Sequence, residues 1–95
     1  MPKVDSIAVV GLGLWFNSHD HLPPHFHAEK PGDWAVRVHF LRDASVMCEV
    51  VYTRRPRRPT KKDLKALVTK AEANREQLHQ EWERKVSVQD PGASQ

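Results

Sequence analysis

HFHAEKPGDWAVRVHF, residues 25–40, is the stretch that decides the fold. Apolar and polar side chains alternate over residues 25–29 and again over residues 34–40, which is typical of a β-strand with one buried face. Pro31-Gly32-Asp33 between the two runs has the composition of a turn. We therefore predict two strands joined by a turn. The polar face of the first strand would carry His25, His27 and Glu29.

Two further strand-like segments flank this pair. Residues 7–16 are largely apolar and interrupted by two glycines, and residues 46–52 are largely apolar after a polar turn. Pro23 and Pro24 lack a backbone N–H and fix φ, so they end the first strand and keep the following connection extended. Four short strands in succession predict an antiparallel meander.

The C-terminal part of the chain predicts one long amphipathic helix. Thr60-x-x-Asp63 is a variant of the capping box that starts helices, and apolar positions then recur at three- and four-residue intervals to about Arg84. This stripe should pack on the sheet, with Trp82, Trp34 and Phe40 in the core. The predicted fold class is α+β, a small antiparallel three- to four-stranded sheet packed against one long C-terminal helix. Residues 1–88 would form a single domain and residues 89–95 a flexible tail.

Length and composition are those of a small soluble domain. The chain has 95 residues, 39% hydrophobic and 28% charged, with a formal net charge of +3. No stretch approaches the roughly 20 apolar residues that cross a bilayer, and the N-terminus lacks the pattern of a secretory signal. We therefore expect a cytoplasmic protein without a membrane partner. A homodimer is a further candidate assembly, because small domains often bury additional apolar surface by association.

Histidines are the strongest indication of function. Four of the six lie between positions 19 and 27, together with Asp20 and the proline pair. Histidine is the side chain whose unperturbed pKa lies nearest neutrality, and it is also the commonest metal ligand. One hypothesis is therefore a site in which His21, His25 and His27 bind zinc or another divalent metal, leaving one position open.

A second hypothesis needs no metal. One histidine of this set would act as general base and another as general acid, with Asp20 orienting an imidazole, as in RNA cleavage through the 2′-hydroxyl. Arg37 or the basic loop would assist, and His39 would join if the sheet brings it to the same face. A third alternative is structural, since histidines can fill a polar, half-exposed sheet face. The sequence leaves all three open.

A basic segment follows the last predicted strand. Residues 53–59 contain two prolines and no apolar side chain, which predicts an extended loop. The cations around it would contact the phosphates of RNA or DNA, or would simply be solvated. They are Arg54, Arg55, Arg57, Arg58, Lys61 and Lys62.

The segment Asp20-His21-x-Pro23-Pro24-His25-Phe26-His27 resembles the hallmark of the small bacterial proteins grouped as domain of unknown function 4160. The other residues that match this family's pattern are Gly11 or Gly13, Ala35, Leu78 and Trp82. The resemblance implies a member of a toxin–antitoxin-like gene pair, with a cognate small antitoxin-like protein as partner and an RNA or ribosome target. We therefore predict a toxin–antitoxin-type component that binds or cleaves RNA through the histidine cluster and the basic loop. The alternatives are a non-enzymatic binding module for a protein or nucleic acid and a metal-binding protein with histidine ligands.

Overall fold

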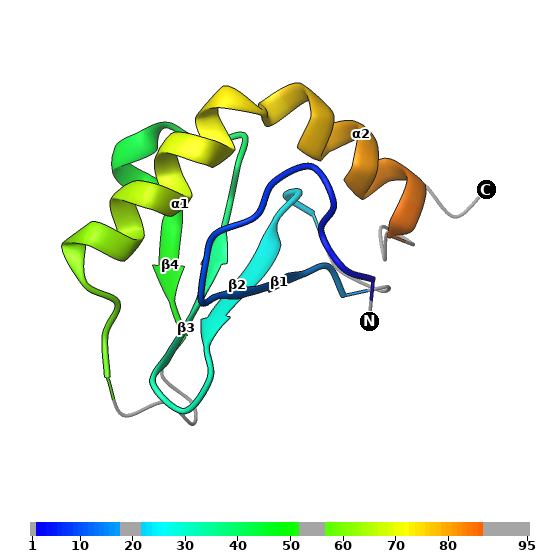
Figure 1. Ribbon diagram of the computed structural model, residues 1–95. Helices are drawn as coiled ribbons and strands as arrows, with labels where there is room; N and C mark the ends of the chain where they lie inside the picture. Colours follow the sequence, from blue (N-terminus) through cyan, green and yellow to red (C-terminus); the bar gives the residue numbers. More distant parts are fainter. Residues whose placement is uncertain (1, 18–21, 52–56, 87–95) are drawn as a thin grey trace.

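The computed structural model describes residues 2–17, 22–51 and 57–86. They form a four-stranded antiparallel sheet of order β1-β2-β3-β4, with helices packed along one face (Figure 1). The elements in chain order are β1 (Gly13–Trp15), β2 (Phe26–Lys30), β3 (Trp34–Val38), the 3-10 turn η1 (Ala44–Val46), β4 (Cys48–Val50), α1 (Lys61–Ala73) and α2 (Arg75–Lys85). The predicted α+β class and antiparallel sheet are confirmed. The tail predicted over residues 89–95 lies outside the described residues.

The hairpin of β2 and β3 forms as its alternating pattern predicts. Phe26 and Ala28 are fully buried, whereas His27 between them is partly exposed. Asp33 N–H donates to the Lys30 carbonyl over 2.9 Å and closes the turn. Gly32 occupies this turn with a φ of 76°, a conformation that glycine adopts without steric cost.

The first strand is much shorter than predicted. β1 covers only three residues, because Leu12 N–H donates to the Val9 carbonyl over 3.1 Å and the chain turns at Gly11, where φ is 84°. Ile7 is nevertheless buried, so the apolar run contributes to the core without pairing as a strand. The residues before Ile7 run back alongside β1. There, Lys3 forms an isolated antiparallel bridge with Trp15.

The fourth strand is also shorter than predicted. Residues 44–46 form η1 instead, and pairing with β3 begins at Cys48. Val51 N–H still donates to the Ala35 carbonyl over 3.0 Å, so the chain remains beside β3 to the end of this described range. Residue 52, the predicted end of the strand, lies outside the described residues.

The prediction of one long helix is wrong, because the helical segment is divided at Asn74 into α1 and α2. Asn74 has φ −126° and ψ 26°, and its side-chain amide donates to the Lys70 carbonyl over 2.9 Å. Asparagine readily makes such local bonds, which compete with the regular helical ladder. The apolar stripe continues through the break, with Leu67, Leu78 and Trp82 all buried.

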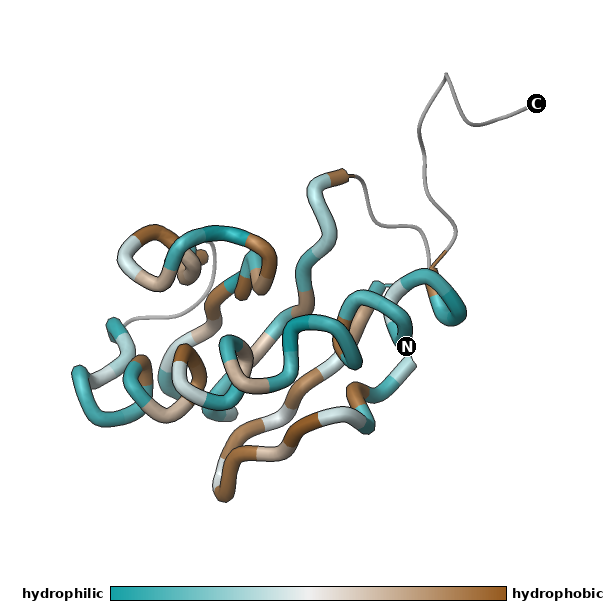
Figure 2. Tube along the Cα trace, turned by 90° about the horizontal axis from the view of Figure 1, so that it is seen from above, coloured by the Kyte–Doolittle hydropathy of each residue, from teal (hydrophilic) through white to brown (hydrophobic). Residues whose placement is uncertain are grey.

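The core lies between the sheet and the two helices. Trp34, Phe40 and Trp82 are buried there, as predicted, together with Phe16 and Phe26. Hydrophilic positions predominate along the helices, and hydrophobic positions along the strands beneath them (Figure 2). Neither α1 nor α2 covers the opposite face of the sheet, which we call the outer face (Figure 1). In the described ranges, no helix has the length and hydrophobicity needed to cross a membrane.

Candidate functional site

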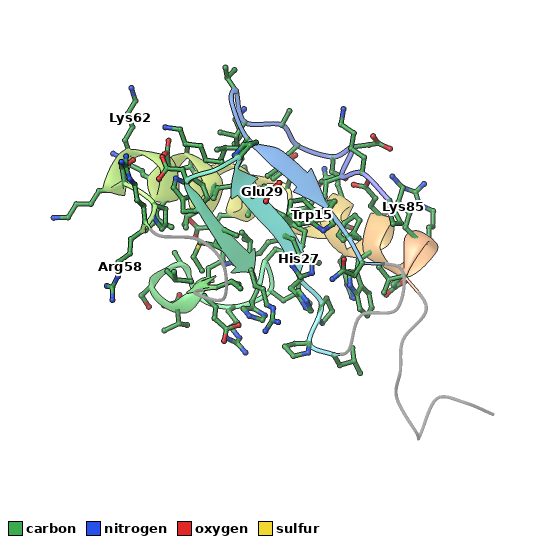
Figure 3. The ribbon with its side chains drawn as sticks, turned by 90° about the horizontal axis from the view of Figure 1, so that it is seen from below. Trp15, His27, Glu29, Arg58, Lys62 and Lys85 are labelled. Carbon is green, nitrogen blue, oxygen red and sulfur yellow. The ribbon has the colours of Figure 1, made fainter. Side chains whose placement is uncertain are left out.

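A row of polar and aromatic side chains crosses the outer face of the sheet. The strand registers place Trp15 opposite His27, His27 opposite Arg37, and Arg37 opposite Glu49. Directly opposed residues of antiparallel strands project to the same face. The bridge between Lys3 and Trp15 extends the row by one position. Figure 3 views this face and shows Trp15 and His27 on neighbouring strands.

Three imidazoles converge beside this row. His25 directly precedes β2, His27 lies within β2, and His39 directly follows β3. The ring centroids of His25 and His27 are 5.1 Å apart, and those of His25 and His39 are 5.3 Å apart. His27 also stacks on Trp15, with centroids 5.5 Å apart and an interplanar angle of 17°. The structure thus brings together two of the predicted site histidines and adds His39.

Hydrogen bonds orient two of these rings. The Nδ1 atom of His25 lies 2.9 Å from the Pro23 carbonyl oxygen. A carbonyl only accepts, so Nδ1 carries the proton and proton transfer by His25 falls to Nε2. The Nε2 atom of His27 lies 2.9 Å from the side-chain amide nitrogen of Asn17, which acts as donor to it. The connection before β2 is not simply extended, as predicted, because it bends at Leu22 and Pro23, whose peptide bond is cis. The Pro23 carbonyl instead fixes the ring of His25.

His39 is tied to β4 through Glu49. Its Nε2–H donates to Glu49 Oε1 over 3.2 Å, and Arg37 lies 3.6 Å from the same oxygen. Burial lowers the pKa of His39 below its ordinary value, although the Glu49 carboxylate opposes this effect. The hydrogen bond from His39 in turn lowers the pKa of Glu49. At neutral pH, His39 is therefore a neutral imidazole beside an ionised carboxylate.

The imidazoles face a small pocket with a volume of about 210 Å³. Its lining combines the three histidines with a guanidinium, an amide and two apolar side chains. These residues are Asn17, Leu22, Pro23, His25, His27, Arg37 and His39. A pocket with an amide donor, imidazole nitrogens and one permanent cation is suited to a phosphate group.

The remaining predicted site residues lie elsewhere or outside the described residues. The predicted site residues outside the described ranges are Asp20, His21, Arg54 and Arg55. The side chains of the other four cations are exposed, and Arg58 and Lys62 lie away from His27 in Figure 3. These four are Arg57, Arg58, Lys61 and Lys62.

The basic segment and the pocket lie at opposite ends of the hairpin. Arg57 N–H donates to the Asp33 carbonyl over 3.2 Å, which places the segment at the turn of β2 and β3. His39 follows six residues after Asp33, a strand length of roughly 20 Å. The two cationic features therefore cannot contact the same phosphate, and a ligand that reaches both must be extended.

The predicted metal set includes His21, which lies outside the described residues. Across the part of the chain that the structure does describe, no three His, Cys, Asp or Glu side chains are placed to hold a metal ion. The single cysteine, Cys48, is partly buried in β4, and burial raises its pKa to about 11. It is therefore a thiol at neutral pH.

Three residues near the histidines were not predicted as part of a site. Trp15, Asn17 and Glu49 lie ten or more positions from their histidine partners in sequence, so local patterns do not connect them. The signal that would have found two of them is the strand register, which aligns Trp15 with His27 and Glu49 with Arg37, whereas Asn17 follows β1 and is outside this register. Register depends on how whole strands pack and is weakly encoded in any one segment.

Comparison with known proteins gives a family without an assigned activity. No curated protein and no solved structure matches the chain significantly. The family model described as Domain of unknown function (DUF4160) matches residues 11–83. Because this match covers most of the chain, the protein belongs to the DUF4160 family.

Proposed function

We propose that the protein binds RNA at the outer-face pocket and cleaves it by histidine acid–base chemistry. The observation that carries this proposal is the convergence of His25, His27 and His39 beside Arg37 in one pocket. Two imidazoles and a guanidinium are sufficient for cleavage through the 2′-hydroxyl without a metal. The toxin–antitoxin association and a cognate small protein partner remain predictions from the resemblance.

The hydrogen bond to the His25 ring supports different roles for His25 and His27. His25, whose protonated Nδ1 bonds to the Pro23 carbonyl, would use Nε2 to accept the proton of the 2′-hydroxyl. The 2′-oxygen then attacks phosphorus, and the bond from phosphorus to the 5′-oxygen breaks. The imidazolium form of His27, with the Asn17 amide turned so that its oxygen accepts from Nε2–H, donates its Nδ1 proton to that 5′-oxygen. The products are a 2′,3′-cyclic phosphate and a 5′-hydroxyl. Arg37 would stabilise the charge on the non-bridging oxygens.

His39 would act as a positioning residue in this scheme. It packs on His25, with ring centroids 5.3 Å apart, and is only 5% exposed. Burial keeps its pKa low, so it adds no positive charge next to His25 at neutral pH. The neutral His39 ring therefore places no like charge beside the ring that would accept the 2′-hydroxyl proton.

The test is cleavage of an end-labelled single-stranded RNA by the purified protein in the presence of EDTA. We expect His25→Ala and His27→Ala to lower the rate by about a hundredfold or more, and a DNA strand of the same sequence to stay intact. The matched control is His79→Ala, because His79 lies on α2 and pairs with Glu83 over 3.1 Å, away from the pocket. His21→Ala belongs in the same series. Equal cleavage by wild type, His25→Ala and His27→Ala would contradict the proposal.

Two other outcomes would favour the remaining hypotheses. Histidine-dependent RNA binding without turnover would replace cleavage by a non-enzymatic binding module. Activity lost in EDTA, together with a stoichiometric metal lost in His21→Ala, would favour the metal site instead. Elemental analysis of protein purified without a histidine tag measures that metal directly.

A further inference from the structure

We infer that Trp15 is a stacking platform for one unpaired base of RNA, with Lys3 and Arg37 as phosphate contacts on either side. The inference rests on the proposed function and deepens it, since it assigns single-stranded rather than duplex RNA as the ligand. Trp15 and Lys3 are not among the residues that line the pocket, whereas Arg37 lines it, and none of the three takes part in the proton transfers.

The exposure of Trp15 is the first observation. The other two tryptophans are core residues, with Trp34 1% and Trp82 3% exposed. Trp15 instead projects from β1 to the outer face and is only partly buried. One side of its indole stacks on His27 at an angle of 17°, so the other side faces away from β2. An aromatic ring held in this way on a sheet surface is suited to stack on a base.

Charge on both sides of the ring is the second observation. The row across the sheet runs Lys3, Trp15, His27, Arg37, so a cation lies beyond each side of the aromatic pair. Lys3 and Arg37 are three strand spacings apart, roughly 14 Å. The Arg37 side chain is 47% exposed and lies 3.6 Å from Glu49, a loose pairing that leaves its guanidinium accessible. A strand crossing this row could place phosphates on both cations and a base between them.

The row next to Trp15 consists of Gly13, Glu29 and Ala35. Gly13 lies opposite Glu29, and Glu29 lies opposite Ala35, so small residues flank Glu29 on both sides. A Cβ added at Gly13 would meet only the Glu29 side chain, at 4.0 Å. The two small residues leave the Glu29 side chain, which leans over Gly13, as the one large group of the row next to Trp15.

Binding of a short 2′-O-methyl RNA oligonucleotide tests this inference, because the blocked 2′-oxygen prevents cleavage. We expect the oligonucleotide to quench Trp15 fluorescence, and Trp15→Ala to weaken binding about tenfold. Trp15→Phe, which keeps an aromatic ring, should stay within about threefold of wild type. An abasic oligomer of the same length should bind more weakly and should not respond to Trp15→Ala. Circular dichroism and thermal unfolding check that the variants are folded.

The outcomes separate the inference from the proposed function. Equal binding by wild type and a folded Trp15→Ala variant would overturn the inference, even if histidine-dependent cleavage is observed. Trp15-dependent binding without any cleavage of unmodified RNA would keep the inference and overturn the proposed cleavage. Equal affinity for the abasic and the complete oligomer, or preference for a duplex of the same sequence, would also overturn the inference.

Discussion

His39 shows what the sequence can and cannot predict at the scale of one residue. Alternation along residues 34–40 correctly places it on the face opposite Val36 and Val38. The same pattern does not predict that it is buried, because that depends on its contacts with Glu49 and His25. Among the described residues, its Nδ1 atom is buried without a hydrogen-bond partner. The indole nitrogens of the core residues Trp34 and Trp82 are in the same state, so this atom does not by itself mark a site.

The titration of His39 gives a residue-scale prediction. Because burial dominates, its NMR titration midpoint should lie below the ordinary value of 6.5. The Glu49→Gln variant should titrate at a still lower pH, because it removes the carboxylate that favours the imidazolium. An unchanged or higher midpoint in Glu49→Gln would show that the pair does not interact. Since the pKa is lower in the folded state, His39 should reduce stability as the pH falls below 6.5.

At the scale of elements, local signals predicted starts and turns better than lengths. Thr60 caps α1, with its Oγ1 accepting from Asp63 N–H over 3.1 Å, as the capping motif predicts. The break at Asn74 was missed because the apolar stripe passes through it unchanged. The first strand was predicted too long because residues 7–12 are apolar, yet the turn at Gly11 takes them out of pairing. Composition alone does not show whether an apolar run finds a strand partner.

The cap of α1 gives an element-scale prediction. Thr60→Ala should lower the free energy of unfolding by about 1 kcal/mol, because Asp63 N–H loses its acceptor at the helix start. Thr69→Ala is the matched control, since Thr69 is an exposed residue within α1 and alanine favours helix there. Urea unfolding of both variants measures the difference. Equal stability of the two variants would show that the cap contributes nothing.

At the scale of the whole molecule, Glu81 joins the two ends of the chain. Its buried carboxylate accepts from Asp5 N–H at 2.6 Å, Ser6 N–H at 2.9 Å and Lys85 Nζ at 2.6 Å. Burial acts to raise the pKa of Glu81, but these hydrogen bonds and that of the Ser6 hydroxyl outweigh it and hold the pKa below 4.5. This network fixes the N-terminal segment whose Lys3 and Trp15 form the outer-face row. Asp5 and Ser6 lie more than 70 positions from Glu81, so no local pattern predicts these contacts, whereas Lys85 lies at the i,i+4 spacing of a helix.

Glu81→Gln should therefore destabilise the fold by about 2 kcal/mol, because an amide cannot accept all of these bonds. The stabilisation from Glu81 is complete above pH 4.5 and is lost as the pH falls through its lower folded pKa. Denaturant unfolding at pH 7 and at pH 3 should thus show a smaller pH effect in the variant than in wild type. Glu83→Gln is the control on α2, since Glu83 is exposed. If both variants behave alike, the buried network is not a source of stability.

The account as a whole depends on the outer-face imidazoles acting as one site for a phosphate. Histidine-selective NMR, recorded while a non-cleavable 2′-O-methyl dinucleotide is added, tests this most directly. The ring signals of His25, His27 and His39 should shift together along one saturation curve, because their rings lie 5.1 and 5.3 Å apart in one pocket. The signal of His79, on the exposed side of α2, should not move. Unchanged signals from all three pocket histidines at saturating dinucleotide, or a shift confined to His79, would contradict the account.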